Sequence, residues 1–586
     1  MMRDYDFLLR KRAKERAVAG GAGTNMWEIS AMVCLFPLSL WTLRVLLRIG
    51  PKRGHRRGIW RRIILEFAVL VVPVVSAFTH WARIAIVGTI LVAVGASVIA
   101  AGLALRRRAT GAAWDAAGRI HPTLIHGAPP HAPDTQLAHA ARPRLHFVSC
   151  YRAAVLLSTS VAILAVDFPA LFPRRFSKTE EFGAGLMDIG VGSFVLSAAI
   201  VAAAPRADCR PTLQTATRRV APLLTLGFAR LATVKSLEYQ EHVSEYGVHW
   251  NFFFTAAAVG FFSAVLPVVL PPLGALFRAA PVGCPCAVGT FLMLVHEAAL
   301  SGGVAEYILR APRMGGTTLH ALLSQNREGV CSMPGFLALH FLGAGLGQWL
   351  RRELGGFSAP STHGGTGCEW KPRKRTTGAQ TGGRHLHGRH RGGVRRWRSL
   401  ATLLVLNMFL WTIVVVPRLR SNGDGPSGAY AETLGACGRC YDGRVSRRMC
   451  NAPYIVWILA LGTLVLAAAL AIDLAAGIFF GGPGQEGTPV AGGRTPLRGA
   501  QTMGERMLFS GEGEICGDAI SVLIRALNSN MLPIFLLANA FTGFANVSLS
   551  TLELSAGLAF STILLYMWAL IAVACMCFLH GLRLKL

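Results

Sequence analysis

A short polar stretch at 166–193 lies between apolar segments and contains the residues best suited to chemistry. Charged groups at the ends of membrane-spanning segments are costly to place, so their presence favours a functional role. Carboxylates could exchange protons here, and arginines could bind anions. A solvated loop whose arginines contact lipid headgroups is an equally good interpretation of the residues alone. The ionisable residues are Asp167, Arg174, Arg175, Lys178, Glu180, Glu181 and Asp188.

A second polar stretch, 235–251, has the spacing of an acidic and histidine-rich helix face. Such a stripe could bind a polyol, relay protons or hold a metal, or it could be a water-exposed amphipathic turn. No H-E-x-x-H pattern or comparable pair of ligands occurs, so we expect no metal. Asn251 follows, at the start of an aromatic run. Spacings of three and four residues place these side chains on one face: Glu238, Glu241, His242, Glu245 and His249.

Two shorter motifs contain amides. Asn326 and Glu328 belong to an Asn-Arg-Glu-Gly sequence that is typical of a turn with an adjoining ion pair. Asn539 and Asn546 lie in an apolar run, where amides can hydrogen-bond across helices. Each motif has a structural explanation when it is taken by itself.

The composition places all of these motifs in a membrane protein. The chain has 586 residues, of which 52% are hydrophobic and 15% charged, and its mean hydropathy is +0.45. Soluble proteins have about 25% charged residues. The apolar runs are rich in Leu, Val and Ala without strict alternation, which favours helices over a barrel. We therefore expect an all-α, polytopic transmembrane helical bundle.

About thirteen apolar runs recur along the chain, several of them shorter than the roughly 20 residues of a full span. We expect a single multi-pass membrane domain over 1–586. It is interrupted by a basic, low-complexity insertion at 351–398 with the composition of a disordered segment, and by variable loops at 106–145 and 480–517. The runs are 26–47, 63–79, 84–105, 147–166, 186–204, 220–234, 252–270, 282–300, 333–350, 400–416, 453–479, 519–541 and 554–579.

The net charge of +29 is concentrated in the connections, which fits anionic lipid headgroups better than nucleic acid. The connections after runs one, three, five, nine and eleven and the basic tail predict a cytosolic side by the positive-inside rule. The N-terminus would then be luminal and the C-terminus cytosolic. Arg174, Arg175, the connection 418–448 and the basic N-terminus are exceptions. On this topology, the three polar motifs that lie in connections between runs (166–193, 235–251 and the Asn326–Glu328 motif) share one non-cytosolic side, as expected of a single site.

An enzyme and a polytopic transporter or flippase of lipid or sugar substrates both fit charged residues at span ends. The motifs together, however, resemble the glycosylphosphatidylinositol (GPI) inositol-acyltransferase family, or glucosaminyl-phosphatidylinositol acyltransferases. The resemblance extends with gaps from about residue 16 to 580 and includes Tyr151-Arg-Ala-Ala and Gly23-Thr24…Glu28-Ile29. Its main segments are DFPALFPRRFSKTEEFGAGLMDIGVGSFV from Asp167, YQEHVSEYGVHWNFFFT from Tyr239, NREG from Asn326 and FLLANAFTGFANVSLSTL from Phe535.

The resemblance implies a multi-pass enzyme of the endoplasmic reticulum membrane. Such an enzyme transfers a fatty acyl chain, usually palmitoyl, from acyl-CoA to the inositol ring of glucosaminyl-phosphatidylinositol in GPI-anchor biosynthesis. Its partners would be acyl-CoA, the glycolipid and the lipid bilayer. Acyl-CoA would be a substrate, and no cofactor is expected.

On this interpretation two residues are catalytic. Asp167 is the general base for the inositol hydroxyl, because a partly buried carboxylate can take up a proton. Lys178 holds Asp167 or stabilises the oxyanion. Arg174 and Arg175 bind phosphates, since guanidinium groups match phosphate geometry. No activated Ser or Cys is evident, which favours direct transfer without an acyl-enzyme. The remaining residues expected to bind substrate are Asp188, Glu238, Glu241, His242, Glu245, His249, Asn251, Asn326, Glu328, Asn539 and Asn546.

Overall fold

The computed structural model describes residues 20–49, 56–117, 145–202, 213–236, 243–269, 283–354, 384–421, 444–480 and 521–584. Within these residues no β-strand forms, and Gly21 and Thr179 make an isolated bridge. The prediction of an all-α fold is confirmed. The longer helices are α2 (Met26–Ile49), α3 (Arg56–Leu70), α5 (Ala82–Ala117), α6 (His146–Ala165), α7 (Ile189–Ala202), α8 (Leu213–Ser236), α10 (Phe252–Val269), α12 (Gly283–Ala299), α16 (Met333–Leu354), α17 (Arg384–Ser421), α18 (Ala452–Phe480), α21 (Met531–Ser548) and α22 (Ala556–Leu579).

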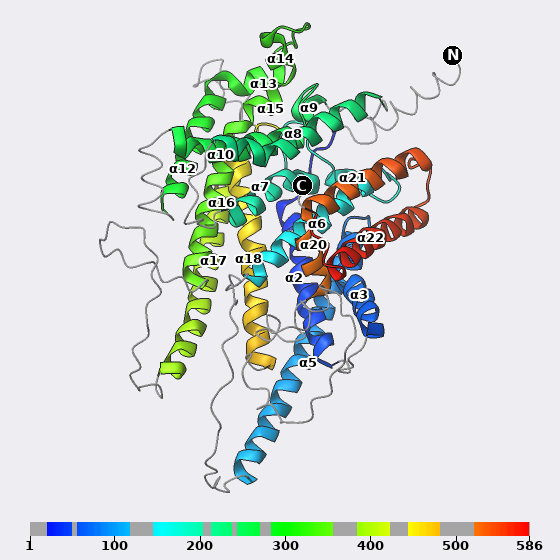
Figure 1. Cartoon of the computed structure of the whole chain (residues 1–586), viewed down its shortest axis with the longest axis vertical. Helices are drawn as coiled ribbons and strands as arrows, with labels where there is room; N and C mark the ends of the chain where they lie inside the picture. The colour runs from blue at the N-terminus through cyan, green and yellow to red at the C-terminus, as the bar shows by residue number, and fades with distance from the viewer. Residues whose placement is uncertain are drawn as a thin grey trace.

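Short helices connect or cap the long ones. Several of them gather at the upper end of the view in Figure 1, where α9, α13, α14 and α15 lie. Their bounds are α4 (Val72–Ala77), η1 (Arg174–Phe176), η2 (Leu186–Asp188), α9 (Val243–Tyr246), η3 (Leu300–Val304), α13 (Ala305–Arg310), α14 (Leu319–Gln325), α15 (Arg327–Cys331) and α20 (Val522–Ser529).

The apolar runs match helices long enough to cross a membrane. Nine candidate spans occur among the described residues, together with three shorter apolar helices at Leu186–Ala202, Val220–Ala232 and Phe252–Pro267. The run predicted at 63–79 corresponds to the pair α3 and α4. A polytopic helical membrane protein is therefore confirmed.

Helix α18 lies at the centre of the bundle. Of its most apolar segment, 78% is buried, the largest share among the nine spans. It packs on α2, α6, α7, α16 and α17, and α17 and α18 run side by side along the long axis in Figure 1. Small residues permit this closeness, because helices in lipid associate through tight packing. A Cβ on Gly192 of α7 would lie 2.7 Å from the Ile458 side chain of α18, and one on Gly462 of α18 would lie 2.5 Å from the Leu196 side chain of α7.

Several predicted boundaries change. Both ends of the predicted insertion at 351–398 are helical, because α16 continues to Leu354 and α17 begins at Arg384; residues 355–383 lie outside the described part. Helix α5 likewise extends to Ala117, into the predicted loop at 106–145, whereas the predicted loop at 480–517 lies almost wholly outside the described residues. The run predicted at 519–541 is two helices, because the chain leaves helical geometry at Asn530 (φ −135°) between α20 and α21.

A buried carboxylate on α3 joins the two ends of the chain. The Glu66 side chain is fully buried and accepts hydrogen bonds from the backbone N–H groups of Val522 (3.0 Å) and Leu523 (2.8 Å) and from Ser521 Oγ (2.7 Å). Arg62 Nε lies 3.0 Å from the same carboxylate. Glu66 thus satisfies the amides that the first turn of α20 leaves unpaired.

We expect Glu66→Gln to destabilise the protein by about 1–3 kcal/mol, because an amide nitrogen cannot accept the N–H groups of α20 and leaves buried donors unsatisfied. Thermal unfolding in detergent micelles would measure the change. Glu306→Gln, on the exposed first turn of α13, is the matched control and should stay within about 0.5 kcal/mol. Equal melting temperatures for the two variants would contradict this role.

Candidate functional site

A cavity of about 1290 Å³ lies among α6, α7, α8, α21 and the segment 245–253. Both residues predicted to be catalytic, Asp167 and Lys178, line it. Its wall also contains these other predicted site residues: Glu245, His249, Asn251, Asn539 and Asn546. Segments that are far apart in the sequence therefore meet around one space.

Asp167 follows the last turn of α6, where Pro169 prevents the helix from continuing. The side chain is 8% exposed, and Asn546 Nδ2 donates to its Oδ2 at 2.6 Å. The same amide group donates to the Thr542 carbonyl at 3.1 Å, one turn earlier in α21. Asn546 is thereby fixed by its own helix, and its amide holds the Asp167 carboxylate at the cavity wall.

Lys178 pairs with a carboxylate from the second polar stretch. Its Nζ lies 2.5 Å from Glu245 Oε2, on α9. Asn546 donates to Asp167 and Lys178 pairs with Glu245, so the two roles expected for Lys178, holding Asp167 or stabilising the oxyanion, stay predictions. The two predicted catalytic residues remain on one cavity, each with its own partner.

Arg447 connects the two polar stretches and also lines the cavity. Its Nε donates to Asp188 Oδ1 (2.9 Å) and its Nη1 to Glu245 Oε1 (3.1 Å), and the residue is 5% exposed. Burial would lower the pKa of Arg447, but Glu245 and Asp188 outweigh it and raise the pKa above its ordinary value. Arg447 is therefore a permanent cation between two carboxylates.

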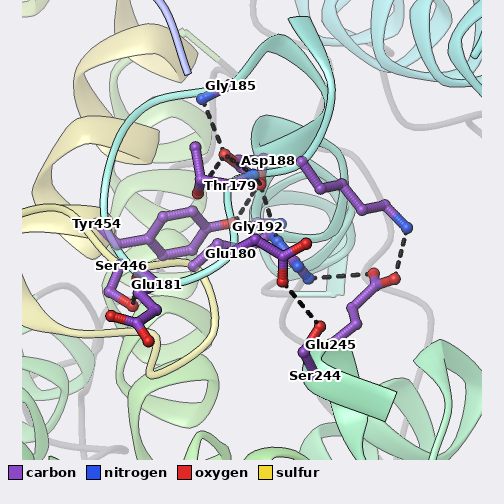
Figure 2. Close-up of polar contacts among 12 residues, drawn as sticks. Thr179, Glu180, Glu181, Gly185, Asp188, Gly192, Ser244, Glu245, Ser446 and Tyr454 are labelled. Carbon is purple, nitrogen blue, oxygen red and sulfur yellow. Dashed lines mark hydrogen bonds and ion pairs between the residues drawn. The ribbon is translucent and has the colours of Figure 1, made fainter. Parts of the chain in front are cut away.

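Asp188 is a structural anchor of the first polar stretch. The residue is fully buried, and its Oδ2 accepts from Thr179 Oγ1 (2.9 Å) and from the Gly185 N–H (2.8 Å), as Figure 2 shows. Its other oxygen binds Arg447. Asp188 does not belong to the described cavity wall and holds the loop and Arg447 in place, and its expected role in substrate binding stays a prediction.

The loop that carries Arg447 is bonded on several sides. Ser446 Oγ donates to the Glu181 carbonyl at 2.6 Å (Figure 2), and Asn451 Oδ1 accepts from the Ser446 N–H at 3.0 Å. Cys450 has a φ of +48°, a left-handed conformation that is uncommon for a residue with a side chain. The sequence analysis missed Arg447. The available signal was the basic connection 418–448, an exception to the predicted topology.

Glu328 and Asn326 support the site from outside it. Glu328 is fully buried and binds Arg313 Nη2 (2.6 Å) and Arg448 Nη2 (2.8 Å). Asn326 Oδ1 accepts from the N–H groups of His249 (2.7 Å) and Trp250 (2.9 Å). Neither residue belongs to the described cavity wall. Both residues brace the loops that form the wall, and substrate binding by either of them stays a prediction.

The predicted acidic and histidine-rich helix face is interrupted. Helix α9 ends at Tyr246, and Gly247 has a φ of +107°. A Cβ at Gly247 would lie 2.5 Å from the Cα of Asn326, so glycine permits this close approach. His249 therefore reaches the cavity from a loop and not from the same helix as Glu245. The other members of the predicted face, Glu238, Glu241 and His242, lie outside the described residues.

Arg174 and Arg175 are exposed and lie outside the described cavity wall. Arg175 Nη2 pairs with Glu28 Oε1 at 3.0 Å, and its guanidinium lies 4.5 Å from the centre of the Phe176 ring. Thr24 Oγ1 donates to the other oxygen of Glu28 at 2.5 Å. The motif at the entry to α2 thus holds Arg175 at the surface, and phosphate binding by either arginine stays a prediction.

Two further predicted residues on the wall have local bonding roles. Asn251 Oδ1 accepts from the Phe253 N–H (3.0 Å) at the start of α10, and its Nδ2 donates to the Gly227 carbonyl (3.0 Å). Asn539 Nδ2 donates to the Phe535 carbonyl (2.8 Å), one turn earlier in α21. Asn251 is therefore a helix cap that also closes the wall, whereas Asn539 lines it from inside α21.

The cavity has both charged and apolar walls. Its charged members are Asp167, Lys178, Arg230, Glu245, Arg447 and Glu553. Phe544 and Val547 line it as well, although they are 72% and 79% exposed, so the apolar wall continues onto the outer surface of α21. No group of three or more His, Cys, Asp or Glu side chains in the described chain is arranged to hold a metal ion. This combination suits an amphiphilic ligand.

We expect Arg447→Met to lower the free energy of unfolding by about 3–5 kcal/mol, because Asp188 would remain buried without its cation. Thermal unfolding of the full chain in detergent would measure this. Arg444→Met is the matched control: Arg444 is exposed in the same loop, and its guanidinium lies 5.2 Å from the centre of the Phe182 ring, so the loss should be below about 1 kcal/mol. Similar losses for both variants would show that Arg447 does not hold the network.

Known proteins are similar to this chain over three quarters or more of its length. The GWT1 family model matches residues 10–577. "GPI-anchored wall transfer protein 1" of Yarrowia lipolytica is 32% identical over 449 residues, which is 76% of this chain and 75% of that protein. The protein of the same name from Aspergillus oryzae is 30% identical and covers 96% of this chain and 97% of its own length. Human "Glucosaminyl-phosphatidylinositol-acyltransferase PIGW" is 27% identical and covers 95% and 96%. The chain described here therefore belongs to the GWT1 family.

Proposed function

We propose that this protein transfers a fatty acyl chain, palmitoyl in the first instance, from acyl-CoA to the inositol ring of glucosaminyl-phosphatidylinositol in GPI-anchor biosynthesis. The observation that supports it best is one cavity in which Asp167 and Lys178 lie beside apolar walls. The name of the human relative, a glucosaminyl-phosphatidylinositol-acyltransferase, supports the same acceptor.

The reaction is a direct acyl transfer in which Asp167 is the general base. Its carboxylate takes the proton of the inositol hydroxyl as the oxygen attacks the thioester carbonyl. The tetrahedral intermediate then loses the CoA thiolate as the C–S bond breaks. The proton held by Asp167 leaves with the thiol, so one ester and one free thiol are formed. Asn546 keeps the Asp167 carboxylate in place during both steps.

Lys178 stabilises the negative charge that develops on the carbonyl oxygen. A positively charged donor that is held in position before the reaction stabilises an oxyanion without a cost of reorganisation. Glu245 fixes this ammonium group, and Arg447 in turn fixes Glu245. Arg447, a cation that cannot lose its proton, occupies Glu245 Oε1 and leaves Oε2 for Lys178.

The open side of the cavity fits two lipid substrates. Exposed Phe544 and Val547 extend the apolar wall to the surface of α21, where a bilayer lipid could enter without leaving the membrane. We place the protein in the endoplasmic reticulum membrane. The polar end of the cavity, where the headgroup would react, then lies on the luminal side. The basic connections that predict the opposite side as cytosolic support this orientation, with a luminal N-terminus and a cytosolic C-terminus.

Asp167→Asn should reduce acyl transfer by at least about 100-fold, because an amide cannot act as a general base. The assay is transfer from acyl-CoA to glucosaminyl-phosphatidylinositol in microsomes, with protein amount checked by immunoblot. Glu181→Gln removes the same charge from an exposed position in the same loop and should retain activity. Undiminished transfer by Asp167→Asn would move the base to Glu245 or His249.

Lys178→Met should lower kcat roughly 100- to 1000-fold, the range found for loss of an oxyanion donor. Lys178→Arg keeps the charge and the pairing with Glu245 and should retain part of the rate. Release of free CoA by purified protein measures the step and separates an enzyme from a transporter, since transport consumes no thioester. A full rate in Lys178→Met would exclude this role for the ammonium group.

A further inference from the structure

Four phenylalanine rings of the cavity wall lie against one another. Phe535 of α21 lies at their centre, with its ring centroid 5.0 Å from that of Phe194 on α7. The rings of Phe252 and Phe253, at the start of α10, lie 5.9 and 6.3 Å from it. Phe535 is 8% exposed and Phe253 4% exposed. Rings from three separate helices therefore meet and fill the space between them.

The cavity wall stops at these rings on each helix. Phe194 is the last wall residue of α7, and Phe253 is the last wall residue of α10. On α21 the wall begins at Phe535 and continues past Asn546, whose amide holds Asp167. The ring cluster therefore closes one end of the cavity, and Asp167 lies away from that end.

The depth of the cavity corresponds to one membrane acyl chain. Eleven positions separate Phe535 from Asn546, and at 1.5 Å per residue of helix they span about 16 Å. Half of a hydrocarbon core of about 30 Å, the depth filled by the chains of one leaflet, is about 15 Å. The wall between the two ends includes apolar positions of α6 and α21, among them Ile163 and Ala540. A chain that starts at Asp167 and is packed as in a leaflet, not fully extended, would thus end at the rings.

We propose that the cluster of Phe194, Phe252, Phe253 and Phe535 is an end stop that selects the length of the transferred acyl chain. The proposal rests on the proposed function, because it places the thioester carbon of the donor at Asp167. A longer chain would meet the rings before its carbonyl reached Asp167. A shorter chain would leave the apolar end of the cavity unfilled and lose contacts there.

Interlocked rings are suited to this role. They meet in tilted and edge-on arrangements, with interplanar angles of 56° between Phe535 and Phe194 and 69° between Phe535 and Phe252. Such pairs have a preferred geometry and hold one another in place. Because the rings come from α7, α10 and α21 and contact one another, displacing one ring would also disturb its neighbours. The end of the cavity is therefore firm.

The test changes the cavity length in both directions. Membranes containing the full chain would receive glucosaminyl-phosphatidylinositol and an equimolar mixture of acyl-CoA donors from lauroyl to arachidoyl, and mass spectrometry would identify the inositol-linked chains. Phe535→Ala should shift the main product by about two to four carbons toward longer chains, because truncation opens space beyond the present end. Ala540→Phe, at an exposed wall position between the rings and Asn546, should shift it toward shorter chains.

Phe409→Ala is the matched control. Phe409 lies on α17, away from the described cavity wall, and is 60% exposed, so the product chains should not change. Unchanged profiles in both Phe535→Ala and Ala540→Phe, with transfer intact, would overturn the end stop and leave the acyltransferase proposal standing. Absence of inositol acylation by the unaltered chain would overturn the proposed function itself. If Phe535→Ala does not accumulate, the profile of Ala540→Phe alone decides.

Discussion

The contact of one guanidinium group with two carboxylates holds together the loops at the polar end of the cavity. Arg447 reaches Asp188 in one loop and Glu245 in another, and Glu245 in turn binds Lys178. Burying such charges costs several kcal/mol per ion, and only close pairing with further hydrogen bonds offsets that cost. Asp188 meets this requirement through Thr179 and Gly185. The position of the proposed oxyanion donor therefore depends on a loop more than 260 residues away in the sequence.

Other buried carboxylates of this protein are satisfied in the same way. Glu328 binds Arg313 and Arg448, and Glu66 binds Arg62 and the first amides of α20. In each case a side chain from one segment supplies what another segment leaves unpaired. Apolar packing alone discriminates poorly between helices in lipid, since lipid tails are as apolar as the helix faces. Pairing of buried charges gives these helix ends and loops a specific partner.

The sequence predicted the helices better than it predicted which side chains contact one another. Hydropathy located the spans, because long apolar helices are required to cross a bilayer. Asp167 and Asn546 were both predicted to be site residues. Their contact, however, joins positions 379 apart in the sequence, and no local sequence pattern indicates such a contact. Glu328 was predicted to bind substrate, although two arginines elsewhere in the chain enclose it. The helical spacing of Glu245 and His249 was misleading because Gly247, with positive φ, ends the helix between them. Arg447 was not predicted, because its role depends on contacts with Asp188 and Glu245, which lie in distant loops.

One tyrosine links the two helices that carry the proposed base and the central ring of the cluster. Tyr566 on α22 donates its hydroxyl to the Ser160 carbonyl of α6 at 3.0 Å and lies 3.3 Å from the Ala538 carbonyl of α21. This contact brings the two carbonyls to one level, and both helices then rise by about 1.5 Å per residue. Seven residues later on α6 the chain reaches Asp167, and eight residues later on α21 it reaches Asn546. The Asp167 and Asn546 side chains therefore lie at a similar distance from the Tyr566 contact, and they meet there. Since Phe535 lies on α21 just before the contact, the same alignment also sets the distance from the rings to Asp167.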